Sequence, residues 1–157
     1  MINNRKAFTM IELVFVIVVL GILAAIAIPR LAVSRGDAQI AKGRADIAAI
    51  RSAIITERQQ RLFMGQSNFI ATLDTGGAQI FGGLPAAVPP QILLQYPLTA
   101  AAGNGNWQTN GNGLTYTYTV SNSNAAGAGA AAFAYVPATG VFDCVNDAAG
   151  VCQALTD

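Results

Sequence analysis

The residues from Phe8 to Ile28 form an almost uninterrupted apolar run, in which only Thr9 and Glu12 are strongly polar. As an α-helix this run would be roughly 32 Å long, close to the ~30 Å hydrocarbon core of a bilayer. A short basic leader with Arg5 and Lys6 precedes it. The run therefore predicts a helical, membrane-spanning appendage, which leaves one small domain for the rest of the 157 residues.

Two ordinary explanations of this run are incomplete. A cleavable signal peptide would use Arg5 and Lys6 as its basic start and Ala25-Ile26-Ala27 as a small-x-small cleavage site. The run is long for that class, however, and a carboxylate inside it is unusual. A plain anchor helix explains the length but gives no reason for Glu12, whose burial at the centre of a bilayer would cost about 2.5–3.5 kcal/mol.

The residues from Lys6 to Glu12, the apolar run and Pro29 together resemble the N-terminus of type IV pilins and of the pseudopilins of type II secretion. The resemblance implies that a prepilin peptidase/methyltransferase cuts between Ala7 and Phe8 and methylates the new amine of Phe8. Glu12 then becomes the fifth mature residue, and Pro29 takes the position of a helix-bending proline. The family usually carries Gly before the cut, where this chain has Ala7.

A buried carboxylate is tolerated when a cation meets it in a medium of low dielectric constant. In the family that cation is held to be the N-terminal amine of a neighbouring subunit. The resemblance thus implies that Glu12 of one chain pairs with Phe8 of the next and sets the stagger of a filament. The alternative is that Glu12 lies at the headgroup edge of the span, where a charge costs little.

Beyond the span, the sequence predicts that the helix continues to about Met64, with a bend at Pro29. Ile40, Ile47, Ile50 and Ile54 recur at helical spacing and predict one buried face, with Ile55 and Leu62 beside it. The charged residues of this segment, Glu57 and Arg61 among them, fall mostly off that face. We interpret these charges as solvated rather than as a surface for DNA or anionic lipid.

The chain after Gly65 predicts a small head that contains β-strands. The stretch Leu114–Ser121 alternates apolar and hydroxyl side chains, and 131–136 and 141–144 form a predicted hairpin. We expect 66–97 to be an irregular connection with a helical turn at 91–94, and 99–113 to be a loop. The fold class is therefore α+β and pilin-like: a leader (1–7), a transmembrane polymerisation helix (8–28), an amphipathic stem (29–64) and a globular β head (65–157).

Charge and composition exclude several functions for the head. All nine Lys and Arg lie at or before Arg61, and no His is present. A head without bases cannot neutralise phosphates, so no nucleic-acid partner is expected. Without His, neither a Ser/His/Asp relay nor a His-containing zinc site can form, and two Cys cannot hold a four-thiolate cluster. We expect no enzymatic activity and no catalytic residues.

Cys144 and Cys152 would be spare thiols in a cytosolic chain. In the exported head that the resemblance implies, a disulfide between them is the default, since that compartment is oxidising. Asp143, Asn146 and Asp147 offer three oxygen ligands within a short stretch. Pseudopilins commonly bind calcium in their C-terminal loops, so the resemblance implies a possible Ca²⁺ site here, although Asp and Asn are also ordinary turn residues.

The resemblance implies a structural subunit that polymerises with copies of itself and with minor pilins, guided by an inner-membrane assembly platform. The expected location is the bacterial inner membrane, among its lipids, as a single span with a cytoplasmic N-terminus and a periplasmic head, and later a periplasmic or surface filament. We favour a type II secretion pseudopilin, which helps to export folded proteins. The alternative is a type IV pilus subunit for adhesion, twitching motility or DNA uptake. A more distant alternative is an exported binding domain or enzyme with an ordinary signal peptide.

Overall fold

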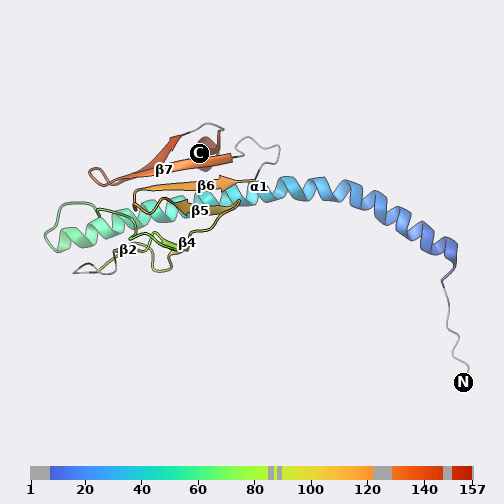
Figure 1. Cartoon of the computed structure of the whole chain (residues 1–157), viewed down its shortest axis with the longest axis horizontal. Helices are drawn as coiled ribbons and strands as arrows, with labels where there is room; N and C mark the ends of the chain where they lie inside the picture. The colour runs from blue at the N-terminus through green and yellow to red at the C-terminus, as the bar shows by residue number, and fades with distance from the viewer. Residues whose placement is uncertain (1–7, 85–86, 88–89, 122–128, 147–149, 157) are drawn as a thin grey trace, which may run out of the picture.

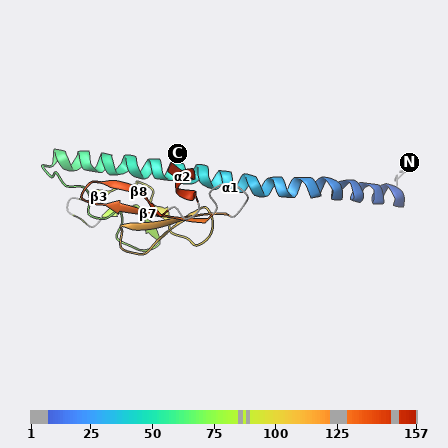
Figure 2. The same cartoon turned by 90° about the horizontal axis from the view of Figure 1, so that it is seen from above.

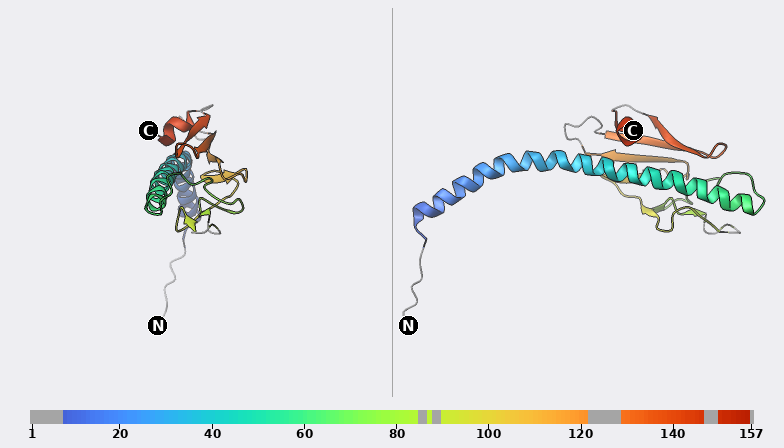
Figure 3. Two further views of the ribbon diagram at one scale, coloured as in Figure 1. Left: turned by 90° about the vertical axis from the view of Figure 1, so that its left-hand side faces the viewer. Right: turned by 180° about the vertical axis from the view of Figure 1, so that it is seen from behind.

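A computed structural model describes residues 8–84, 87, 90–121, 129–146 and 150–156, and for residues 29–34 it describes the backbone alone. A long helix, α1, extends through the molecule, and a small head covers one side of its C-terminal half (Figure 1). The view along the helix axis shows the head confined to that side of α1 (Figure 3, left). The predicted α+β, pilin-like architecture is confirmed: a long N-terminal apolar helix is followed by a small antiparallel sheet.

Helix α1 spans Met10–Phe63, with Thr9 as its N-cap and Met64 as its C-cap. Its 54 residues correspond to a length of about 80 Å. The helix continues through Pro29 without a break. The predicted bend takes the form of a gradual curvature along the N-terminal part of α1 (Figure 1). A proline removes one backbone hydrogen bond and leaves the neighbouring turns in place, which is compatible with curvature of this kind.

The face of α1 that contacts the head is more polar than the sequence indicates. Ile47, Ile50 and Ile54 are buried as predicted, whereas Ile55 is 58% exposed. The buried stripe continues into Glu57 and Arg61, which are 3% and 8% exposed. The prediction that these two charges lie off the buried face is wrong, because positions 50, 54, 57 and 61 follow one another at helical spacing on the same side.

The head is built on a four-stranded antiparallel sheet in the order β5-β6-β7-β8. Strands β6 (Thr115–Val120), β7 (Gly129–Val136) and β8 (Val141–Asn146) correspond to the three predicted strands. Strand β5 (Asn106–Thr109) lies inside the predicted 99–113 loop and pairs with β6, so that Trp107 faces Tyr118. The loop prediction is wrong here because β5 is too short to show alternation by itself and is stabilised by its pairing with β6.

Two short ribbons replace the predicted irregular connection between α1 and the sheet. Strand β1 (Gln79–Ile80) pairs with β4 (Leu98–Thr99), and β2 (Gly83–Leu84) pairs with β3 (Gln91–Ile92). The predicted helical turn at 91–94 is therefore wrong at its first two residues, which are extended. Their backbone groups bond to β2, a partner that no local pattern in the sequence specifies.

A second, short helix, α2 (Val151–Thr156), packs against α1 and the sheet near the C-terminus (Figure 2). Its Val151, Cys152 and Leu155 are buried. They join a core in which aromatic rings fill the space between α1 and the sheet: Phe81, Trp107, Tyr116, Tyr118, Phe133 and Phe142. This core fixes the head to one face of the stem and leaves the N-terminal part of α1 outside it.

Candidate functional site

The N-terminal part of α1 is the largest apolar surface in the described structure. Residues Met10–Ile28 have a mean hydropathy of 3.1, and none of this segment is buried. By length and composition, these 19 residues could cross a membrane. The segment projects from the head as a bare rod (Figure 3, right). An apolar surface of this extent is stable only when lipid or other protein covers it.

The Thr9 side chain caps the start of α1, a feature that the sequence analysis did not identify. The Thr9 Oγ1 atom accepts a hydrogen bond from the Glu12 backbone N–H at 3.3 Å. Glu12 thus lies in the first turn, where the helix dipole favours a negative charge. The Thr-x-x-Glu spacing was the available signal. Glu12 is therefore positioned beside the N-terminal end of the helix, next to Phe8, before any partner chain is considered.

The residues predicted for processing and assembly lie at or near the two ends of the apolar segment. Phe8 precedes the helix and is exposed, whereas Ala7 lies outside the described residues. Pro29 lies on the helix backbone just past the span. Cleavage between Ala7 and Phe8, methylation of Phe8 and the assembly role of Glu12 stay predictions.

Cations of the stem fix the head to α1. Lys42 Nζ donates to the carbonyl oxygen of Gly105 at 2.7 Å, and Arg44 Nε donates to that of Ala154 at 2.7 Å. Arg51 donates from Nε to the carbonyl oxygen of Phe142 at 3.0 Å. Such charge-assisted bonds are stronger than neutral ones. These three cations therefore have a structural role, and the interpretation of the basic run as a merely solvated face is wrong for them.

A half-buried carboxylate of the stem bonds to β5, an edge strand of the sheet. Asp46 Oδ2 accepts the indole N–H of Trp107 at 3.0 Å. Burial raises the pKa of Asp46, while the Trp107 hydrogen bond and the charge of Lys42 act in the opposite direction. The free energy of unfolding therefore depends on pH through this contact between α1 and β5.

The opposite face of the stem carries no charge over several turns. Its exposed residues recur at helical spacing and are small or uncharged: Ala41, Ala45, Ala48, Ser52, Ile55 and Gln59. Exposed helix faces in soluble proteins usually carry charges. This face is therefore uncharged from Ala41 to Gln59, on the side turned away from the head.

A disulfide joins Cys144 of β8 to Cys152 of α2, with their Cα atoms 5.9 Å apart. The pairing that was expected for an exported head is thus present. The bond ties the C-terminal helix to the edge of the sheet, where Arg44 also holds α2 through Ala154. Together they fix the end of the chain against α1.

The residues predicted to hold calcium are only partly described. Asp143 and Asn146 lie on β8, and Asp147 lies outside the described residues. The Asp143 Oδ1 atom forms an ion pair with Arg51 Nη2 at 2.9 Å and also accepts the Cys144 backbone N–H at 2.9 Å. Within the described residues, no group of three or more His, Cys, Asp or Glu could hold a metal ion. Calcium binding stays a prediction.

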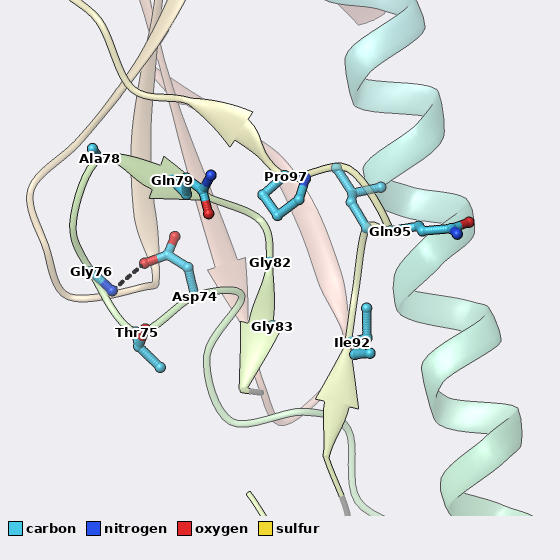
Figure 4. Close-up of a pocket in the computed structure, with 11 residues that line it drawn as sticks. Asp74, Thr75, Gly76, Ala78, Gln79, Gly82, Gly83, Ile92, Gln95 and Pro97 are labelled. Carbon is cyan, nitrogen blue, oxygen red and sulfur yellow. Dashed lines mark hydrogen bonds between the residues drawn. The ribbon is translucent and has the colours of Figure 1, made fainter. Parts of the chain in front are cut away.

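A surface hollow of about 520 Å³ lies between the two short ribbons of the head. Figure 4 shows its labelled lining residues, with Asp74 turned toward Gly76. The Asp74 Oδ1 atom accepts the Gly76 N–H at 2.7 Å, and its Oδ2 atom accepts the hydroxyl of Tyr116. Both carboxylate oxygens therefore have structural partners, and the other lining residues are mainly glycines, apolar side chains and glutamines.

Two comparisons with known proteins give matches, one of them to the N-terminal segment. A family model described as the prokaryotic N-terminal methylation motif matches residues 2–28. The chain is therefore type IV pilin-like. The pilin-like chain is also 52% identical over 50 residues to the type IV narrow pilus major component PilA5 of Thermus thermophilus.

That match includes 32% of the pilin-like chain and 43% of PilA5, so it spans less than half of the relative's length. No solved structure matches the chain at a significant level. The family model thus agrees with the apolar helix in indicating a type IV pilin-like chain with an N-terminal methylation motif. The family model does not extend to the head.

Proposed function

We propose that the chain is a non-enzymatic, structural subunit of a type IV pilus-like filament and polymerises through the N-terminal half of α1. The observation that carries this proposal is the uncovered apolar rod Met10–Ile28, together with its methylation motif. Lipid covers this rod while the subunit is stored in the membrane. In a filament, like helices replace the lipid, and close packing between them supplies the stabilisation.

The uncharged face of the stem supports the same mode of assembly. Ala41, Ala48 and Ile55 are exposed on the side of α1 opposite the head. Small side chains let helix backbones approach closely, and a face without charges removes the desolvation penalty that packing would otherwise incur. Neighbouring helices can thus remain in contact beyond the span, while the heads form the outer surface.

We propose that Glu12 of one subunit pairs with the methylated amine of Phe8 in the next. The Thr9 cap supports this because it places Glu12 in the first turn, close to the chain end that the cut would create. An isolated carboxylate within apolar surroundings is costly, and pairing with an ammonium group removes much of that cost. The competing hypothesis is that Glu12 lies among lipid headgroups without a protein partner.

The processing steps and partners follow from this function. A prepilin peptidase/methyltransferase would cut between Ala7 and Phe8 on the cytoplasmic side of the bacterial inner membrane. The head would lie in the periplasm, and an assembly platform would add the subunit to copies of itself and to minor pilins. Mass spectrometry of the mature chain tests this directly: a methylated N-terminal Phe8 is expected. An N-terminus at Ile28 would indicate a signal peptide, and an intact Met1 would indicate a plain anchor.

Two systems could use such a subunit. The likeness to PilA5, a major pilus component, favours a type IV pilus subunit, which would serve adhesion, twitching motility or DNA uptake. The sequence-based hypothesis is a pseudopilin of type II secretion. The methylation motif lies in the N-terminal part that both classes share, so the choice needs a phenotype. Deleting the gene should abolish surface filaments in the first case and the export of folded proteins in the second.

The assembly mechanism is tested by replacing Glu12 with Ala, Gln or Asp and measuring filament formation while membrane insertion is monitored. We expect Glu12→Ala and Glu12→Gln to insert normally and to lose most filaments, and Glu12→Asp to retain part of the assembly. Thr9→Ala is the matched control, because it removes the cap and keeps the charge, and it should assemble. Normal filaments from both the Ala and the Gln variants would overturn the pairing.

A further inference from the structure

Two arginines near the C-terminal end of α1 each have an Nε atom without a hydrogen-bond acceptor among the described residues. Arg58 and Arg61 lie one helical turn apart, where side chains at i and i+3 are neighbours. The Nε atom of each is covered from solvent and has no hydrogen-bond partner in the described part of the chain. Arg61 as a whole is 8% exposed. These two cations therefore differ from the other cations of the stem.

The contrast with Lys42, Arg44 and Arg51 is informative. Each of these three donates to a backbone carbonyl of the head at 2.7–3.0 Å. The large majority of buried side-chain polar atoms in proteins are hydrogen-bonded, and an unsatisfied one needs an explanation, such as a bound ion. A buried N–H of a guanidinium without an acceptor is costlier still, because the group is charged. Two such N–H groups, on side chains one helical turn apart, indicate a shared external acceptor.

The neighbouring groups do not supply that acceptor. The guanidinium of Arg58 stacks on the ring of Phe69, with its Cζ atom 4.0 Å from the ring centroid. The hydroxyl of Tyr135 donates to the carbonyl oxygen of Ile70 at 2.8 Å and forms no hydrogen bond with Arg61. Stacking holds the Arg58 guanidinium plane in position and leaves its N–H edge available.

Glu57 is the nearest carboxylate on the same face and is 3% exposed. In the described residues it forms no ion pair with either arginine, since the ion pair found there joins Arg51 to Asp143. Burial raises the pKa of Glu57, and the charge of Arg61 acts in the opposite direction. Glu57 therefore compensates the charge of Arg61 only in part, and Arg58 has no carboxylate partner among these residues.

We propose that Arg58 and Arg61 form a binding site for a small oxyanion, either phosphate or a carboxylate. Planar guanidinium groups present several N–H donors in a fixed geometry that matches the oxygen atoms of both anions. The bound oxyanion accepts hydrogen bonds from both side chains and compensates the excess positive charge. It thereby stabilises the end of the head that is farthest from the span.

The test is thermal unfolding of the full chain in detergent with sodium phosphate, sodium acetate or sodium chloride at equal ionic strength. At ten times the dissociation constant, a bound anion should raise Tm by about 3 °C. A larger shift in phosphate than in acetate identifies phosphate as the preferred ligand, and the reverse identifies a carboxylate. Arg61→Gln and Arg58→Gln should each remove the difference from chloride.

Phosphate also stabilises proteins without specific binding, because it is excluded from their surfaces. Arg44→Gln is the matched control, since it removes one cation from the same helix at a position that has a protein acceptor. It should keep the full shift. If Arg61→Gln does not fold, Arg58→Gln still tests the proposal, because Arg58 is only half-buried. The proposal is overturned if the three salts give equal Tm values, or if the shift persists in Arg58→Gln.

Discussion

Gly43 of α1 lies directly against the ring of Tyr118 in β6. A Cβ atom placed on Gly43 would come within 2.8 Å of Tyr118 Cε1 and 2.6 Å of Leu155 Cδ2. The ring of Tyr118 cannot move away easily, because its hydroxyl donates to the carbonyl oxygen of Gln39 at 2.6 Å. Glycine weakens a helix by itself. At position 43 it is nevertheless required, because only glycine lets the sheet and α2 pack this closely against α1.

Replacing Gly43 with Ala should destabilise the head, although Ala favours the helix by about 1 kcal/mol. Crowding in a packed core costs about 1–3 kcal/mol, and here two side chains oppose the added methyl group. Chemical denaturation of the full chain, followed by Trp107 fluorescence, measures the difference. Gly21→Ala is the control, because an added Cβ meets nothing within 4 Å there. A Gly43→Ala variant more stable than wild type would contradict this account.

Asp46 should make the stability of the head fall as the pH rises. Burial raises the pKa of Asp46 in the folded state above the value of 3.8 in the unfolded chain. The contribution of Asp46 to the free energy of unfolding is therefore fully present below pH 3.8 and is lost as the pH rises through the folded-state pKa. Asp46→Asn keeps an acceptor for Trp107 and removes the charge, so it should be more stable than wild type at pH 7. That advantage should vanish near pH 3.

Denaturation curves of both proteins at several pH values check this prediction. Glu57, whose pKa is also raised by burial, leaves a residual pH dependence in both. Asp46→Ala, which also lacks the acceptor, should be less stable than Asp46→Asn at every pH. An Asn variant with the same pH dependence as wild type would show that Asp46 does not cause it.

Reducing the disulfide should loosen the C-terminal helix. Cys144 and Cys152 are eight positions apart, and closing a loop of this size contributes about 2–3 kcal/mol in the chain-entropy estimate. The double variant Cys144→Ser/Cys152→Ser should unfold at lower denaturant concentration than the oxidised wild type. The reduced wild type should match it. If reduction leaves the midpoint unchanged, the tether is not a source of stability.

Calcium binding through Asp143, Asn146 and Asp147 is checked by comparing Tm with calcium and with chelator. We expect calcium to raise Tm and Asp143→Asn to lose the response. Because Arg51 pairs with the Asp143 carboxylate at 2.9 Å, Arg51→Gln should free that oxygen and strengthen the response. An identical Tm with calcium and with chelator, in both wild type and Arg51→Gln, removes the calcium prediction.

Local patterns in the sequence predicted the elements that depend on local physics. The uninterrupted apolar run gave the N-terminal part of α1, and period-two alternation gave β6 and the β7–β8 hairpin. The Thr9 cap of α1 is also a local feature, which the Thr-x-x-Glu spacing indicates. Three elements have no local periodicity that predicts them: strand β5, the β2–β3 ribbon and helix α2. They are short, and contacts with other parts of the chain stabilise them.

The sequence by itself determined the N-terminal span, its methylation motif and the α+β class, since hydrophobicity and spacing are properties of the chain alone. Only the tertiary structure decided the roles of the stem. Lys42 and Arg44 bond to backbone carbonyls, which every residue carries and which therefore leave no signature in the sequence. Burial of Glu57 and Arg61, and the need for Gly43, arise where the head meets α1. Such contacts join residues that are far apart in the chain, and folding alone brings them together.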